Sequence, residues 1–219
     1  MADYRVWSTT DGPPTSVSDG VALNLGMDFR VTEDYRVRQL GFWRGDEAPV
    51  PDLARLYRVE SSTVGTVLAE ATPVYAGTGW QLTTLAAPVP LTVDQWYRVV
   101  FHFPAAFSIS TGYWHNPGGA GAGGVTSGPL VVPDFTQAPY GQCIYSVGAP
   151  GFPTLPGTAS NYWLDVVVEP GEIGTTDSVT SGRVVGAVRT AAAMNSGGRR
   201  GSRVVPVPRR LDRMRGATR

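Results

Sequence analysis

The chain has 219 residues, of which 42% are hydrophobic, so it is long enough to bury a sizeable core in one or two domains. Its 27 glycines and 18 prolines make up about a fifth of the residues, which favours a turn-rich all-β protein over a helical one. The single cysteine, Cys143, excludes an intrachain disulfide. The chain contains no apolar run of about eighteen residues, which excludes a transmembrane helix.

The net charge of zero is the sum of two opposite parts. Residues 1–173 contain eight Arg and sixteen Asp or Glu, a net charge of −8. Residues 174–219 contain ten Arg and two Asp, a net charge of +8. A body and a tail of opposite sign predict that the tail is an interaction segment. Residues 1–12 lack the basic and apolar regions of a signal peptide, so we expect no export by that route.

Short β-rich segments separated by turn residues fill the first 169 positions. We expect strands, in chain order, at Tyr4–Ser8, Val21–Val31, Asp34–Trp43, Leu53–Ser61, Gly65–Thr72, Trp80–Leu85, Trp96–Phe103, Ala106–Tyr113, Pro129–Val132, Gln142–Val147 and Asn161–Glu169. The tight turn at Thr32-Glu33 predicts an antiparallel hairpin between the second and third of these, and the fourth and fifth form another pair. A spacing of about ten residues per strand favours an antiparallel β-sandwich, with a jelly-roll-like topology preferred.

The segment Trp96–Phe103 carries the strongest β signal. Aromatic and β-branched residues dominate it, which suits a pleated, half-buried surface. Alternation places Val99, Phe101 and Phe103 on one strongly apolar face. His102 lies on the other face, and we expect a half-buried sheet histidine there rather than a catalytic or zinc-binding one.

We divide the chain into three parts. Residues 1–20 form an N-terminal strand and connection, residues 21–173 form the β-sandwich domain, and residues 174–219 form an extended Arg-rich C-terminal arm. The arm has no aromatic residue and cannot bury enough apolar surface to order itself, so we expect it to be disordered unless docked in an assembly. The candidate anchoring residues of the arm are Arg199, Arg200, Arg203, Arg209, Arg210, Arg213 and Arg215.

The best candidate for ligand contact precedes a glycine-rich segment that we expect to be a flexible surface loop. Aromatic faces stack on sugar rings, and Asn and His side chains supply hydrogen bonds. The contact candidates are Tyr113, Trp114, His115, Asn116 and, near another loop, Trp43. The alternative is that Tyr113 and Trp114 end a strand and cap the core.

No recognised catalytic or metal-binding motif occurs, so we expect no enzymatic activity, no catalytic residue, no cofactor and no metal site of defined spacing. Hard cations bind loop carboxylates in many β-sandwiches, which leaves a structural calcium ion as the alternative to solvated turns. The carboxylates in predicted loops are Asp11, Asp19, Glu33, Asp34, Asp46 and Glu47.

Four segments resemble, in order and spacing, a bacterial β-sandwich family known as domain of unknown function 4082. They are Gln39–Gly45, Gly79–Phe101, Thr126–Leu130 and Asn161–Val168, and the similarity extends over about two-thirds of the chain. The resemblance implies either a secreted module, often found beside carbohydrate-active domains, or a minor tail protein of phages that infect actinobacteria. It implies no catalytic residues.

These observations lead us to expect a non-enzymatic phage virion protein. The favoured form is a minor tail or tail-tip protein whose sandwich faces outward, with possible contact to host-surface glycans, and whose basic arm anchors it. Its partners would be other virion proteins and copies of itself; nucleic acid binding by the arm is the less favoured alternative, and we expect no membrane insertion. A capsid decoration or head-fibre protein and a secreted carbohydrate-binding module are the alternatives.

Overall fold

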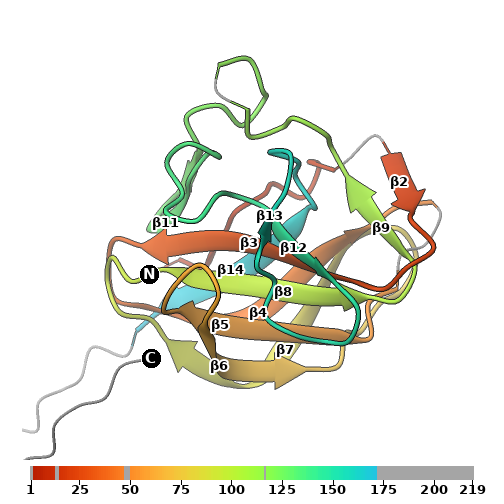
Figure 1. Cartoon of the computed structure of the whole chain (residues 1–219). Helices are drawn as coiled ribbons and strands as arrows, with labels where there is room; N and C mark the ends of the chain where they lie inside the picture. Colours follow the sequence, from red (N-terminus) through yellow and green to blue (C-terminus); the bar gives the residue numbers. More distant parts are fainter. Residues whose placement is uncertain (1, 13–14, 47–49, 116, 172–219) are drawn as a thin grey trace, which may run out of the picture. The chain divides into compact units, whose positions relative to one another are not determined.

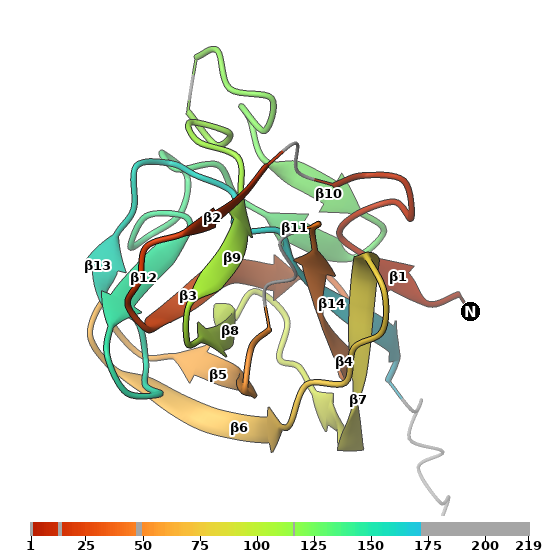
Figure 2. The ribbon, with the colours of Figure 1, turned by 90° about the vertical axis from the view of Figure 1, so that its right-hand side faces the viewer.

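Two antiparallel β-sheets pack face to face in the computed structural model of the chain, which confirms the predicted all-β sandwich (Figures 1 and 2). The structure describes residues 2–12, 15–46, 50–115 and 117–171. The predicted C-terminal arm lies outside these residues, and so do its seven candidate anchoring arginines. None of the described residues forms a helix that could cross a membrane.

The smaller sheet has four strands and forms one layer of the sandwich. In spatial order these are β1 (Tyr4–Arg5), β14 (Leu164–Pro170), β4 (Tyr35–Arg44) and β7 (Gly79–Pro90). Figure 2 shows them side by side, next to the strands of the other layer. The N-terminal strand therefore pairs with the last strand of the sandwich, with Tyr4 opposite Val168.

The larger sheet has eight strands and forms the other layer. Its main path runs β10 (Val125–Ser127), β11 (Leu130–Val132), β3 (Leu23–Val31), β8 (Tyr97–Phe103), β5 (Leu53–Val59) and β6 (Gly65–Ala71). The other two strands of this sheet are β12 (Ile144–Val147), which pairs with the first half of β3, and β13 (Leu155–Pro156), which pairs with β12. A separate two-stranded ribbon consists of β2 (Thr15–Ser18) and β9 (Ala106–Ile109).

Aromatic side chains from both sheets meet in the core. Phe42 on β4 contacts Phe101 and Phe103 on β8, with ring centroids 5.3 and 6.0 Å apart. All three side chains are buried, as are Leu40 on β4 and Leu56 on β5. The inward positions of each strand thus supply one continuous core, as alternation along a strand requires.

The predicted hairpin between β3 and β4 is wrong. The two strands are consecutive, but β3 pairs with β8, β11 and β12, whereas β4 pairs with β14 and β7. The turn at Thr32-Glu33 therefore carries the chain from one sheet to the other. The predicted pairing of β5 with β6 is confirmed.

Strand β8 is buried on both faces, although the sequence predicted one face in the core and the other half-exposed. The segment 148–153 covers its outer face. His102 donates a hydrogen bond from Nε2 to the Gly148 carbonyl oxygen at 3.0 Å, and its Nδ1 lies 2.6 Å from a carboxylate oxygen of Asp52. Arg98 donates to the Pro153 carbonyl oxygen at 2.6 Å and lies over the Phe152 ring.

Candidate functional site

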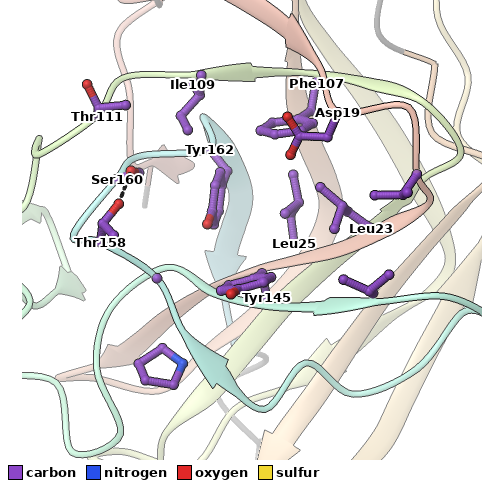
Figure 3. Close-up of a pocket in the computed structure, with 14 residues that line it drawn as sticks. Asp19, Leu23, Leu25, Phe107, Ile109, Thr111, Tyr145, Thr158, Ser160 and Tyr162 are labelled. Atoms are coloured by element: carbon purple, nitrogen blue, oxygen red, sulfur yellow. Dashed lines mark hydrogen bonds between the residues drawn. The ribbon is translucent and has the colours of Figure 1, made fainter.

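A cleft of about 350 Å³ opens at the side of the larger sheet, between β12 and the β2–β9 ribbon (Figure 3). Its walls come from β3, β9, β12, β13 and the connection that leads into β14. The volume is near the lower end of the range of about 300–1,000 Å³ that is usual for ligand pockets. A small molecule, or the end of a larger one, fits a cleft of this size.

Strand register explains the apolar wall of the cleft. Tyr145 and Val147 on β12 are paired with Leu25 and Leu23 on β3, so all four side chains point to the same face of the sheet. All four line the cleft. Phe107 stands opposite them on β9.

Tyr162 closes the wall on the side of β14. Its ring packs edge-to-face against Phe107, with centroids 6.0 Å apart, and only 7% of the residue is exposed. Burial raises the pKa of the Tyr162 hydroxyl, and the neighbouring groups Cys143, Tyr145 and Asp19 raise it further. Tyr162 is therefore a neutral phenol at physiological pH, able to donate and accept hydrogen bonds.

Polar groups lie at two ends of the cleft. At one end the hydroxyls of Thr158 and Ser160 are 3.2 Å apart, and Thr111 lies nearby (Figure 3). Asp19 brings a carboxylate to the other end of the cleft (Figure 3). The cleft thus offers an apolar, aromatic middle between a hydroxyl end and a carboxylate end, which suits binding and orienting an amphipathic molecule.

Two apolar side chains at the cleft are left in solvent. Val147 is 61% exposed and Val21 is 45% exposed. Leu155, on the neighbouring strand β13, is 47% exposed. Apolar side chains that gather on the surface around a cavity commonly mark a binding site, because their contact with water is unfavourable until a partner covers them.

Trp114, one of the predicted contact residues, belongs to the core. Its side chain is fully buried, and its indole nitrogen donates a hydrogen bond to the Cys143 sulfur at 3.0 Å. It therefore has no surface with which to touch a glycan, and the prediction for this residue is wrong. The position of Trp114 agrees with the alternative prediction, in which this residue caps the core.

The other predicted contact residues are partly brought together. Tyr113 and Trp43 are half-buried members of one aromatic cluster, joined through Trp80 and Trp163 by ring contacts of 5.6, 6.4 and 5.6 Å. His115 is exposed, and Asn116 lies outside the described residues. Neither Tyr113, His115 nor Trp43 lines the cleft, so their role as contacts stays a prediction.

The glycine-rich segment after Tyr113 folds back on itself. Gly119 donates to the His115 carbonyl oxygen at 2.8 Å, and Gly121 donates to that of Tyr113, also at 2.8 Å. A Cβ atom at Gly121 would lie 2.5 Å from the Tyr113 ring, so only glycine fits this close approach. The described part of this segment is thus tied to the scaffold by backbone hydrogen bonds.

The single cysteine and the acidic and histidine side chains show what the described residues offer to a nucleophilic or metal-binding site. Burial raises the pKa of the Cys143 thiol to about 12, so the sulfur is protonated and a poor nucleophile. Within the described ranges no three His, Cys, Asp or Glu side chains gather where they could hold a metal ion. The lining of the cleft contains no His, Cys or Arg among those residues.

The fold and the cleft define an all-β sandwich with a ligand-sized opening beside its core. A family model described as domain of unknown function DUF4082 matches residues 9–164, which are 156 of the 219 residues. The chain therefore belongs to the DUF4082 family, as its sequence segments predicted. No curated protein sequence matches the chain.

A solved structure with a partly similar backbone arrangement was found in the comparison with known structures. It contains the cysteine protease and lectin-like domains of Cwp84, a surface layer associated protein of Clostridium difficile. The match has a TM-score of 0.40 and 11% sequence identity, and it covers 71% of this chain and 34% of that one. The match thus spans about a third of the length of that solved chain.

Sequence reasoning missed the cleft, because its residues are scattered from Asp19 to Tyr162. A local signal existed for part of it. The alternation in Gln142–Val147 placed Tyr145 and Val147 on one face of a strand, but only the pairing of that strand with β3 shows which face is the open one.

Proposed function

We propose that this protein is a non-enzymatic β-sandwich module that binds a glycan in the cleft between β12 and the β2–β9 ribbon. The observation that carries the proposal is the arrangement of that cleft, in which aromatic and aliphatic walls lie between two polar ends. A sugar has the same two-sided chemistry, since its C–H groups form an apolar face and its hydroxyls lie around the edge of the ring.

Each part of the cleft has a partner on such a ligand. The half-exposed ring of Tyr145 offers an aromatic surface to the apolar face of a pyranose. The hydroxyls of Thr158 and Ser160 both donate and accept hydrogen bonds, as sugar hydroxyls do. The Asp19 carboxylate only accepts, which suits a pair of sugar hydroxyls or another donor.

Replacing Tyr145 by Leu tests the proposal. We expect Tyr145→Leu to weaken glycan binding on an array at least about tenfold, which corresponds to about 1.4 kcal/mol, because the aromatic surface is lost while apolar volume is kept. The measurement is glycan-array binding followed by titration of the best ligand.

Tyr75→Leu is the matched control. Tyr75 is 41% exposed, contacts Arg44 and does not line the cleft, so its replacement should leave binding unchanged. If Tyr145→Leu binds glycan as well as the wild-type protein does, the cleft is not the glycan site. The same conclusion follows if Tyr145→Leu and Tyr75→Leu lose binding equally.

The place of such a module in a virus particle is a finer proposal. The opposite charges of residues 1–173 and 174–219 support it, because a basic segment can attach an acidic body to acidic neighbours, including copies of itself. We propose a minor tail or tail-tip protein in which the module faces outward, with capsid decoration or head-fibre protein and secreted carbohydrate-binding module as alternatives.

Deleting residues 174–219 tests this finer proposal. Phage particles assembled in the presence of the truncated chain should lack it, whereas the full chain should be incorporated in both nuclease-treated and untreated preparations. Incorporation of the truncated chain at the full level would contradict the anchoring role, and incorporation that depends on nucleic acid would favour nucleic acid binding by the arm.

A further inference from the structure

Asp19 is a charged side chain without a counter-ion at the carboxylate end of the cleft. It is exposed, and no ion pair or hydrogen bond of its carboxylate occurs within the described ranges of the chain. Two other surface acids of the sandwich have arginine partners: Glu70 pairs with Arg55 at 2.7 Å, and Glu60 pairs with Arg58 at 2.7 Å. A carboxylate left without a partner beside a cavity is available to a ligand.

The surroundings of Asp19 favour a cation over a neutral donor. Asp19 lines the cleft together with the aromatic residues Phe107 and Tyr162, and its charge contributes to the raised pKa of the Tyr162 hydroxyl. Aromatic faces attract cations through the ring quadrupole, and a carboxylate adds direct charge attraction. An ammonium group placed at this end would gain from both.

The charge around the cleft disfavours anions. The described residues that line it include one carboxylate and no arginine or histidine to oppose that carboxylate. A field of this sign lowers the local concentration of negatively charged ligands.

We propose that Asp19 makes the cleft selective for a saccharide that carries an ammonium group, such as a 2-amino sugar, over its neutral counterpart, and that the cleft rejects uronic acids. This inference rests on the proposed glycan-binding function and names the ligand class of the same site. The ammonium would lie at Asp19, while the apolar face of the ring lies on Tyr145 and the ring hydroxyls face Thr158 and Ser160.

The test uses the full-length protein and two matched sets of three ligands each. The ligands are methyl glycosides of the gluco and galacto series that differ in one group: a 2-amine, the parent hydroxyls or a C6 carboxylate. Affinities are measured by NMR titration at about pH 6, where an amino sugar is protonated. We expect the wild-type protein to prefer the amine over the parent sugar by about two- to fivefold, the size of a partly exposed ion pair, and the carboxylate to bind least.

Two variants separate the local effect of Asp19 from net charge. Asp19→Asn should abolish the preference for the amine and improve binding of the uronic acid. Added salt should also weaken the preference of the wild-type protein for the amine, because it screens the charge of Asp19. Glu33→Gln removes the same charge from an exposed site beyond the far end of β3, roughly 25 Å from Leu23 along the strand. This variant should bind the three kinds of sugar in the same order of affinity as the wild-type protein.

The outcomes distinguish this inference from the function on which it rests. Binding of neutral and amino sugars with equal affinity, or an unchanged order in Asp19→Asn, would overturn the selectivity while leaving the glycan-binding function in place. Failure of the wild-type protein to bind any sugar would overturn both. If Glu33→Gln, like Asp19→Asn, binds the amino, neutral and acidic sugars with similar affinities, the preference depends on net charge rather than on Asp19.

Discussion

Asp165 is a carboxylate that the sandwich buries almost completely at the junction of β1 and β14. It accepts hydrogen bonds from Arg5 Nε at 2.8 Å, from the Val6 amide at 2.9 Å and from the Val166 amide at 2.8 Å. Burial raises the pKa of Asp165 to about 6 from its usual 3.8, although Arg5 and the two amides oppose the rise. The N-terminal strand is thus held by a group whose charge changes in weakly acidic solution.

The raised pKa predicts how stability depends on pH. Since the folded state binds the proton of Asp165 more tightly than the unfolded state, this group contributes stability that is fully present below about pH 4 and is lost as the pH rises through about 6. A rise of about two pKa units corresponds to about 3 kcal/mol in the free energy of unfolding. Denaturant unfolding at a series of pH values measures the loss.

Asp165→Asn is the comparison for that measurement. The variant cannot titrate at this position, so its stability should fall less than that of the wild-type protein between about pH 4 and 6. Parallel stability curves for the two proteins would contradict the assignment of the pH dependence to Asp165.

At the scale of elements, the segment 148–153 is held over β8 by buried polar side chains. The Nε and Nη2 atoms of Arg98 donate hydrogen bonds to the Asp28 carboxylate at 2.5 and 2.9 Å. Both side chains are fully buried. Asn24 on β3 binds the same segment through the Ala149 carbonyl oxygen and the Gly151 amide. These contacts fix the chain that follows β12, the strand that carries Tyr145 and Val147.

Replacing Arg98 by Met should be strongly destabilising. The change leaves Asp28 as a buried carboxylate without its counter-charge, which costs about 3–5 kcal/mol. Burial already raises the pKa of Asp28 against the effect of Arg98, so part of the loss should be recovered in acid as Asp28 takes up a proton. Chemical denaturation measures both effects.

The double variant Arg98→Met with Asp28→Leu tests the cause of that loss. It removes the unpaired charge and should be more stable than Arg98→Met alone. A double variant that is less stable than the single one would contradict this explanation.

The sequence predicted individual strands better than their partners. The aromatic and β-branched run of β8 and the closing strand β14 were apparent because local side-chain pattern determines them. The false β3–β4 hairpin arose because a short polar turn between alternating strands looks alike whether the chain stays in one sheet or crosses to the other. Strands β2, β10 and β13 are short and lie in turn-rich segments, so they gave no signal.

At the scale of the whole molecule, the aromatic residues serve two separate purposes. Five of the six tryptophans join Tyr113 in one cluster of ring contacts; they are Trp7, Trp43, Trp80, Trp114 and Trp163. The cleft uses a different set, Phe107, Tyr145 and Tyr162. Adjacent aromatics in the sequence drew attention to Tyr113 and Trp114, but the candidate site is built by long-range strand pairing that no local pattern reveals.

The proposed function depends on ligand binding in the cleft between β12 and the β2–β9 ribbon. The most direct test is a map of amide chemical-shift changes in the labelled full-length protein, on titration with the best sugar from the array. We predict the largest changes at Leu25, Tyr145, Val147 and Ser160. Changes confined to Trp43, Tyr113 and His115, with the cleft unaffected, would show that the ligand binds outside the cleft.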